Sequence, residues 1–439
     1  MSHEDLVTRH RAVMPSWLSL FYEEPIEIVS GRGCRVTDAD GKTYLDFFAG
    51  ILTNMIGYDV PEVREAINRQ LDRGVMHTST LYLIRSQVEL AEKIADLSGI
   101  PDARVFFTSS GTEANEAALL FATQWRRSNQ VIALRNSYHG RAFATVAITG
   151  NRGWSASSLS PVQVTYAQSG YRYRSPYAHL DDDGFIQACA QDLRDLIETT
   201  TAGDVACMIA EPIQGVGGFT VPPDGLFRAY KEILDEYGIL FVSDEVQTGW
   251  GRTGDHFWGI GAHGVTPDAM TFAKGLGNGA TIGGVVARGD LMNCLTANSI
   301  ATFGGNPVST AAANATLDYV LSHDLQAQAA KTGSLLLEGL RELSEHNPAV
   351  GDVRGRGLMI GIEMVEPGTK VPDSGSAGAV LEAARRGGLL IGKGGLYGNC
   401  LRVAPPLTLT ESEATEGLAI LLDAFDAVSA KGHASDGRE

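Results

Sequence analysis

The length, composition and charge of the chain predict a globular protein and exclude several kinds of binding surface. Its 439 residues, 44% of them hydrophobic, can bury a full core and make two or three lobes of ordinary domain size. A formal net charge of -17 argues against a broad surface for nucleic acid or anionic membranes. An anionic ligand must therefore be held in a local pocket.

The cysteines and the N-terminus favour a reducing compartment and argue against a membrane protein. The chain has no CxxC pair and no His/Cys cluster at zinc-finger spacing. The five cysteines are widely scattered, at Cys34, Cys189, Cys207, Cys294 and Cys400. Residues 1–11 are polar and charged, unlike a signal peptide, and no stretch reaches the roughly 18 apolar residues of a membrane span. We therefore expect a cytoplasmic protein with no metal site and with neither nucleic acid nor membrane as a partner.

From the N-terminus, the pattern predicts a hairpin and then an alternating α/β region. Short β-like runs between residues 25 and 48 flank a turn sequence at 38–41. From about residue 63, short apolar runs alternate with longer helical stretches. The runs expected to be strands are residues 105–107, 131–134, 205–210, 239–242 and 269–273. This spacing predicts a largely parallel sheet covered by helices.

The C-terminal part of the chain predicts a smaller α/β region. Its expected elements are helices at about 306–321 and 324–346, strands at 358–364 and 389–391, a closing helix at 411–428, and a frayed or disordered polar tail at 429–439. We expect a large domain over residues 63–314 and a small domain built from both chain ends, residues 1–62 and 315–439.

Several polar residues follow the predicted strands at the point where each strand ends. Glu211, Asp244 and Lys274 come just after apolar runs, and the segment 138–141 follows the run at 131–134. Open α/β sheets place their ligands at this edge, so one crevice can collect all of these side chains. For any one of these residues alone, the commoner reason for a charged side chain after a strand is that the chain has reached solvent. Their chemical complementarity favours a functional site.

The segment 108–115 has the pattern of an anion site at a helix start. It follows a short strand and opens a helix that is expected to run to about residue 125. The N–H groups and dipole of a helix start attract phosphate, and Gly111 permits close backbone approach. An ordinary N-cap formed by Ser109 or Ser110 explains the motif equally well. The motif is neither GxGxxG nor GxxxxGK[ST], which disfavours a dinucleotide or P-loop site.

The runs that surround Asp244 and Lys274 are far more specific. With other ordered motifs, they make the chain resemble class III aminotransferases of pyridoxal-phosphate fold type I. The motifs that carry the resemblance are residues 241–249 and 271–279, Ser110-Gly111-Thr112, Tyr138-His139-Gly140, the segment 211–215 and the segment 302–307. The likeness covers nearly the whole chain, from the segment 45–48 to the segment 402–407.

The resemblance implies pyridoxal 5′-phosphate as cofactor and assigns its chemistry to two residues. Lys274 is implied to carry the cofactor as a Schiff base and then to move a proton between substrate and cofactor. The cofactor withdraws electrons from the substrate only if its ring nitrogen is protonated, and Asp244 is implied as the carboxylate beside that nitrogen.

The remaining cofactor contacts follow from the same resemblance. Tyr138 is implied to stack on one face of the ring, Val246 to pack on the other, and Gln247 to approach the phenolic oxygen. The phosphate is implied to lie at Ser110, Gly111 and Thr112, with Thr302 reaching the phosphate of a neighbouring subunit, so a homodimer or a higher oligomer is expected. For Tyr138 and Val246 taken alone, simple core packing is at least as good an explanation.

Substrate binding rests on two arginines and one acid. Arg402 matches the family position that binds a substrate α-carboxylate, and Glu211 matches the acid that pairs with this arginine when no carboxylate is present. A purely structural pair is the alternative. Arg141 matches the arginine that grips the distal carboxylate of glutamate or 2-oxoglutarate in 4-aminobutyrate and ornithine aminotransferases, and a solvent-facing Arg141 is the alternative.

The resemblance therefore predicts amino transfer from an amino acid or ω-amine to a keto acid, with 2-oxoglutarate as the first choice. Other segments, such as 77–80 and 256–259, look closer to the alanine–glyoxylate branch, so pyruvate or glyoxylate is the second choice of acceptor. Fold relatives also include amino-acid epimerases and decarboxylases. A non-catalytic scaffold is a further alternative, and the intact Lys274 and Asp244 weigh against it.

Overall fold

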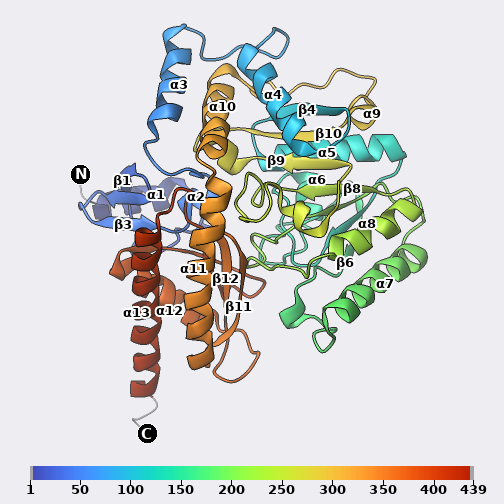
Figure 1. Cartoon of the computed structure of the whole chain (residues 1–439). Coiled ribbons are helices and arrows are strands. Elements are labelled where there is room, and N and C mark those ends of the chain that lie inside the picture. Colours follow the sequence, from blue (N-terminus) through green and yellow to red (C-terminus); the bar gives the residue numbers. More distant parts are fainter. Residues whose placement is uncertain (1–2, 436–439) are drawn as a thin grey trace.

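The computed structural model describes residues 3–435 and has a large lobe built around one seven-stranded sheet (Figure 1). The strands lie in the order β4-β10-β9-β8-β7-β5-β6. Their bounds are β4 Ala103–Thr108, β5 Gln130–Leu134, β6 Gln163–Ala167, β7 Cys207–Ala210, β8 Leu240–Asp244, β9 Ala269–Phe272 and β10 Gly283–Arg288. All of the strands expected in this region are present within a few residues of their predicted positions.

The sheet is largely parallel, as predicted, with one strand reversed. Strands β5 to β9 pair in parallel, whereas β10 runs antiparallel to both of its neighbours, β9 and β4. The five parallel strands between β9 and β6 therefore end at a common edge. This edge carries the residues that follow β5, β7, β8 and β9.

Helices cover both faces of the large sheet, and successive side chains of each strand point alternately to one face and the other. On β5, Val131 and Ala133 lie in an apolar cluster with residues of α5, while Ile132 and Leu134 lie in the cluster that includes α7 and α8. A period of two places successive side chains on opposite faces, which explains the continuous apolar runs in the sequence. The helices of this lobe are α4 Arg85–Ser98, α5 Gly111–Arg126, α6 Phe143–Ala147, α7 Asp182–Thr200, α8 Leu226–Glu236 and α9 Gly289–Met292.

The smaller lobe contains two four-stranded sheets. The first has the order β1-β2-β3-β13 and the second β11-β12-β15-β14. Their bounds are β1 Ile28–Arg32, β2 Arg35–Asp38, β3 Thr43–Asp46, β11 Val350–Arg356, β12 Met359–Met364, β13 Leu389–Leu390, β14 Gly392–Gly394 and β15 Cys400–Val403. The expected N-terminal hairpin is formed by β2 and β3, and β13 pairs in parallel with β3. Segments from the two ends of the chain thus share one sheet.

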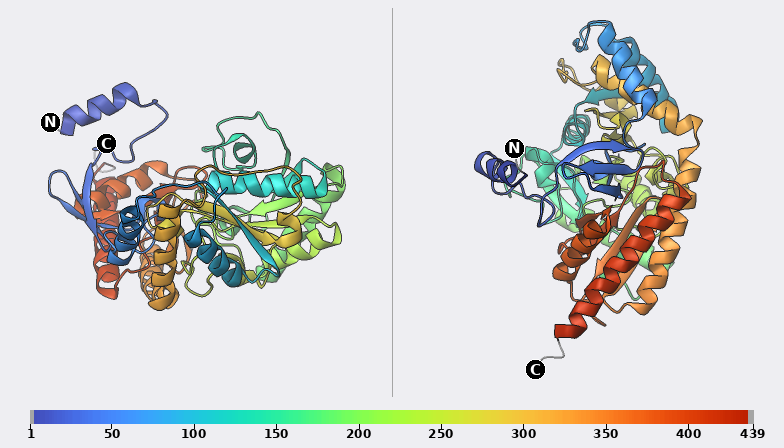
Figure 2. Two further views of the ribbon diagram at one scale, coloured as in Figure 1. Left: turned by 90° about the horizontal axis from the view of Figure 1, so that it is seen from above. Right: turned by 90° about the vertical axis from the view of Figure 1, so that its left-hand side faces the viewer.

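Long helices connect and close the two lobes. The helices outside the large lobe are α1 His3–Val13, α2 Ala49–Leu52, α3 Pro61–Asp72, α10 Pro307–Ser322, α11 Leu325–His346, α12 Ser374–Gly387 and α13 Glu411–Ser435. Helix α13 packs on α11 and α12, while α1 stands away from the body (Figure 2). The domain boundary proposed after residue 314 falls inside α10.

The end of the closing helix differs from the prediction. Helix α13 continues through Ser435 instead of ending at residue 428, so residues 429–435 are helical and not frayed. Extending an existing helix by one residue costs little free energy, because each added residue forms a further backbone hydrogen bond. A contact of 3.5 Å between Asn347 Nδ2 and Ser429 Oγ also holds this part of the helix. The rest of the predicted tail, residues 436–439, lies outside the described residues. Among the described helices, none is long and apolar enough to cross a membrane.

Candidate active site

A cavity of about 330 Å³ lies at the edge where β5, β7, β8 and β9 end, beside the start of α5. It brings together most of the residues that the sequence singled out. Those that line it are Ser110, Gly111, Thr112, Tyr138, Glu211, Asp244, Val246, Gln247 and Lys274. Thr302, Arg141 and Arg402 do not line it. One cavity is therefore lined by a carboxylate, an amine, an aromatic ring and a helix start.

Asp244, the last residue of β8, is fixed by three hydrogen bonds. Its Oδ2 accepts from Asn115 Nδ2 and from His139 Nδ1, both at 2.8 Å, and its Oδ1 accepts from Val246 N at 3.1 Å. Asn115 also donates to the backbone oxygen of His139, which ties the three residues together. The sequence reasoning did not identify His139 and Asn115 as parts of the site. Their only signals were the position of His139 beside Tyr138 and that of Asn115 one helical turn after Gly111.

Lys274 lies on a strained turn directly after β9. Its φ is 44°, a left-handed conformation that non-glycine residues rarely adopt, and it begins the short 3₁₀ helix Lys274–Gly277. Burial lowers the pKa of its amine, while the nearby carboxylates Asp244 and Glu211 oppose this effect. Lowering the pKa increases the fraction of neutral amine, which is the nucleophilic form.

The start of α5 is both a helix cap and a place where backbone can approach a ligand. Ser110 Oγ accepts from Glu113 N at 3.2 Å, and Ser109 N donates to Glu113 Oε2 at 2.8 Å. Ser110 is therefore the N-cap of α5, as the capping explanation expected. Glycine is required opposite this turn. A Cβ on Gly140, whose φ is +133°, would lie 2.7 Å from Thr112 Oγ1.

Buried polar atoms at the cavity lack partners within the described residues. They are Asn115 Oδ1, His139 Nε2 and Gln247 Oε1. Buried polar atoms are nearly always satisfied, so these three call for a polar ligand or water. Together with the helix start, the Asp244 carboxylate, the Lys274 amine and the Tyr138 ring, they fit a planar, phosphorylated heterocycle such as pyridoxal 5′-phosphate.

Glu211 follows β7 and lines the same cavity. One of its oxygens accepts from Tyr138 N at 2.9 Å and the other from Gly215 N at 2.8 Å. Burial raises the pKa of this carboxyl to about 7, with His139 opposing the shift and Asp244 adding to it. Glu211 therefore changes its charge close to neutral pH.

Arg402, on β15, is buried beside the cavity and not inside it. Its Nη1 donates to Gly215 O at 3.2 Å and its Nη2 to Lys393 O at 3.0 Å. The guanidinium lies 4.9 Å from the ring centre of Phe48 and 5.5 Å from that of Phe219. Burial lowers the pKa of Arg402 to about 10. Across residues 3–435 it forms no ion pair with Glu211, so the expected pairing is not made in this conformation.

The other two predicted residues lie at the surface of a single chain. Arg141 is exposed, with its guanidinium 5.4 Å from the ring centre of Trp17. Thr302 is also exposed, in the loop before α10. The ring of Tyr138, which lines the cavity, meets the ring of Trp154 edge-on at 5.6 Å.

Comparison with known families gives a match over most of the chain. A model of the class III aminotransferase family matches residues 22–425. The chain is 40% identical to alanine–glyoxylate aminotransferase 2 homolog 2, mitochondrial, of Arabidopsis thaliana, over 96% of this chain and 86% of that protein. It is 39% identical to acetylornithine aminotransferase of Mycolicibacterium smegmatis (93% and 95%) and 34% identical to leucine/methionine racemase of Thermococcus litoralis (95% and 94%).

Solved structures give the same result. An (S)-enantioselective ω-transaminase from Thermomicrobium roseum superposes with a TM-score of 0.90 at 33% identity, covering 98% of this chain and 99% of that one. An amine transaminase from an uncultivated Pseudomonas species, in its PLP-bound form, superposes with a TM-score of 0.87 at 32% identity, covering 92% and 96%.

The raised pKa of Glu211 predicts a pH-dependent contribution to stability. In the folded state this group binds a proton between its ordinary pKa and about 7, whereas in the unfolded state it does not, so its contribution falls as pH rises through that range. Glu211→Gln should remove this trend. We expect the Tm of the wild type, relative to that of the variant, to fall between pH 5 and pH 8 in thermal unfolding. The exposed Glu232→Gln is the control, and parallel pH profiles for all three proteins would contradict the assignment.

Proposed function

Because the chain belongs to the class III aminotransferases, which use pyridoxal 5′-phosphate, we propose that it moves an amino group from an amino acid or ω-amine to 2-oxoglutarate. The observation that carries the proposal is the cavity that Lys274 and Asp244 share, with Arg402 buried beside it and Arg141 close to Tyr138, which lines it. The family accounts for the transfer of an amino group, and the arginines support the choice of acceptor.

The cofactor, when bound, supplies an electron sink for the carbon that carries the amino group. The chain's own residues supply orientation and proton transfer. Asp244, held by Asn115 and His139, is the carboxylate that would keep a proton on the ring nitrogen. Lys274 Nζ, with its lowered pKa, would take the proton from the substrate's Cα and return it during transfer.

Two features of Arg402 support its role in binding the substrate α-carboxylate. Its guanidinium is held by two backbone carbonyls and two aromatic rings, so it is already ordered. Its Nε is buried without a partner among the described residues, which leaves a donor to be satisfied. A carboxylate bound there would complete a charge-assisted contact at little cost in side-chain entropy. Glu211, which titrates near neutral pH, is the group proposed to balance Arg402 when an amine without a nearby carboxylate enters.

Arg141 supports a dicarboxylate acceptor because it is an exposed cation near Tyr138, which lines the cavity. The second candidate acceptor is glyoxylate or pyruvate, favoured by the identity to the Arabidopsis alanine–glyoxylate aminotransferase homologue. Amino-acid epimerisation is a second candidate reaction, since the Thermococcus relative is named as a racemase.

An apolar patch supports the proposed homodimer. The patch combines the loop before α4 with the loop before α10, and its members are Val75, Met76, Leu81, Tyr82, Leu83, Ile300 and Phe303, all exposed in a single chain. The rings of His77 and Phe303 lie 4.7 Å apart, so the two loops are neighbours. Contiguous apolar surface of this kind marks association sites. Thr302 lies within the patch, which supports its proposed reach to the partner's phosphate.

Two broader expectations belong to the same proposal. All five cysteines are free thiols, in keeping with a reducing cytoplasm. The division into a large domain and a small domain built from both chain ends places the cofactor residues from 110 to 302 in one body and Arg402 in the other. Relative movement of the two bodies would then move Arg402 toward or away from the cavity.

The core of the proposal predicts amino transfer that depends on Lys274 and Asp244. Purified enzyme mixed with a panel of amino acids and ω-amines should convert its bound cofactor to the pyridoxamine form, followed by absorbance, with formation of a keto acid or aldehyde. Lys274→Ala should abolish turnover. Asp244→Asn should slow it by about two orders of magnitude or more, because a preorganised charge is lost. Racemisation of an L-amino acid with no keto-acid product would favour the epimerase instead.

The acceptor assignment predicts a selective effect at Arg141. Arg141→Ala should raise the KM for 2-oxoglutarate by about tenfold or more, since a charge-assisted hydrogen bond is worth about 1.5–3 kcal/mol. The KM for pyruvate, which lacks a distal carboxylate, should change little. Arg135→Ala, an exposed arginine in the same segment, is the matched control. An unchanged KM for 2-oxoglutarate in Arg141→Ala would rule out this role.

The apolar patch predicts that its disruption separates the subunits. Leu83 is 97% exposed in one chain, and Leu83→Glu would place a charge in the proposed interface. We expect a shift from dimer toward monomer in sedimentation velocity and a loss of activity, because Thr302 would no longer reach the neighbouring site. Val371→Glu, at a half-exposed valine outside the patch, should remain dimeric and active. A dimeric Leu83→Glu variant would place the interface elsewhere.

A further inference from the structure

A buried carboxylate outside the cavity lies on the same sheet as Arg402. Glu363, on β12, is completely buried. In the sheet register, Glu363 lies opposite Cys400 and Gly361 lies opposite Arg402. Alternate residues of a strand point to the same face, and so do directly paired residues, so Glu363, Cys400 and Arg402 project from one face of this sheet.

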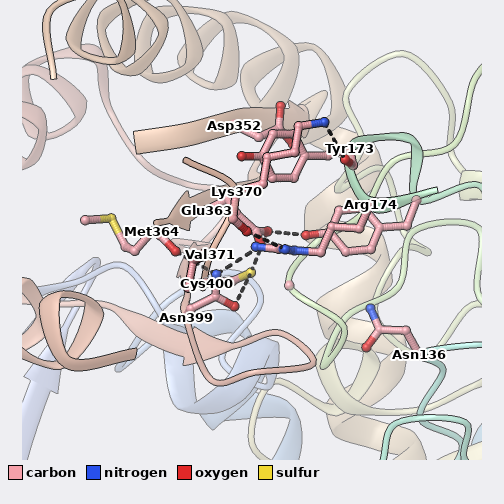
Figure 3. A network of polar contacts seen from close by, with 12 residues as sticks. Asn136, Tyr173, Arg174, Asp352, Glu363, Met364, Lys370, Val371, Asn399 and Cys400 are labelled. Atoms are coloured by element: carbon pink, nitrogen blue, oxygen red, sulfur yellow. Dashed lines mark hydrogen bonds and ion pairs between the residues drawn. The ribbon is translucent and has the colours of Figure 1, made fainter. Parts of the chain in front are cut away.

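Glu363 receives hydrogen bonds from both lobes of the molecule (Figure 3). From the segment after β6 in the large lobe, Arg174 Nε donates to Oε1 at 2.8 Å, and the hydroxyl of Tyr171 donates to Oε2. From the small lobe, Asn399 Nδ2 donates to Oε1 and Cys400 Sγ to Oε2, both at 3.0 Å. One carboxylate thus joins the segment after β6 to the start of β15.

Arg354 extends this contact toward the active site. Its Nη2 donates to Glu363 Oε2 at 3.0 Å and to Gly218 O at 2.8 Å, and its Nη1 donates to Asp352 Oδ2 at 2.8 Å. Burial opposes ionisation of Glu363, but the charge of Arg354 and the hydrogen bonds to Glu363 outweigh it and hold the pKa of this carboxyl at about 2. Without the Glu363 charge, two guanidinium groups would be left underneutralised in a buried site.

The loop that contains Gly218 is also the loop that touches Arg402 and Glu211. Gly215 O accepts from Arg402 Nη1 at 3.2 Å, and Gly215 N donates to Glu211 at 2.8 Å. Arg354 therefore holds this loop at Gly218, while the two proposed substrate residues hold it at Gly215. Cys400 fixes β15 only two residues before Arg402. Glu363 bonds both Arg354, which holds the loop at Gly218, and Cys400, which fixes β15.

We infer that Glu363 is a positioning residue that holds the Arg402 guanidinium in place for a substrate α-carboxylate. This inference rests on the proposed function of Arg402. Glu363 does not line the cavity and acts through Cys400 and Arg354. Loss of its charge should let the start of β15 and the loop at Gly218 shift, so that Arg402 meets the carboxylate in the wrong place.

The test uses holoenzyme in single-turnover reactions with L-alanine and with L-glutamate. Such reactions give the half-saturating concentration of the amino acid separately from the limiting rate. Glu363→Gln keeps the size of the side chain and removes its charge. We expect a rise of about tenfold in the half-saturating concentration of both amino acids, with the limiting rate within about threefold, because small misplacements of a binding group are costly. Arg402→Ala should raise half-saturation at least as much. In the Arg402→Ala background, Glu363→Gln should add little, because the two changes remove the same interaction.

Matched variants separate positioning from general loss of stability. Asp268→Asn removes another largely buried carboxylate that bonds an arginine, Arg288, at the opposite edge of the large sheet, and should leave half-saturation unchanged. If Glu363→Gln does not yield folded holoenzyme, Cys400→Ala removes the thiol that joins β15 to Glu363 and Arg354, and should raise half-saturation about threefold. A large effect of Arg402→Ala with none from the Glu363 or Cys400 variant would overturn the inference alone. No effect of Arg402→Ala would overturn the proposed function of Arg402.

Discussion

The structure depends on one buried carboxylate at the end of a parallel strand. Asp244 is fixed from α5 by Asn115 and from the loop after β5 by His139, so three elements of the large lobe converge on two oxygen atoms. Hydrogen bonds to both oxygens restrict rotation of this carboxylate, so that it stays directed at the cavity. Val246 N also donates to Asp244, and Tyr138, which precedes His139, donates its N–H to Glu211, so these residues are connected to the same carboxylate.

The chemistry of the cavity comes from opposing electrostatic effects on neighbouring groups. Burial lowers the pKa of the Lys274 amine and raises that of the Glu211 carboxyl, so both shifts reduce the charge that the protein must bury. A cavity whose amine and carboxyl are more easily neutral suits an enzyme that must admit both an anionic substrate and a cofactor that carries a phosphate. The arginines stay outside this cavity, where aromatic rings and backbone carbonyls stabilise their charge.

The sequence predicted the strands that are continuously apolar and the residues that follow them, because both properties are local. It missed β10 and β6 in the large sheet, and β11, β14 and β15 in the small lobe. Strand β10 begins with two glycines, and a Cβ on Gly284 would lie 2.5 Å from the ring of Phe272, so glycine is dictated by a neighbour that is remote in sequence. His139 and Asn115 were missed for the same reason, since their role exists only where two elements meet. The resemblance supplied the cofactor residues, but it could not show that Arg402 would stand apart from Glu211.

The parallel pairing of β13 with β3 has a consequence for biosynthesis. The N-terminal strands leave the ribosome first, yet the partner for the open edge of β3 is made only near the far end of the chain. Until then that edge exposes unpaired backbone groups, which are prone to pair with other nascent chains. The small lobe can close only after translation of the large lobe is complete, so a prematurely terminated chain would keep this edge open and become a candidate for chaperone binding or degradation.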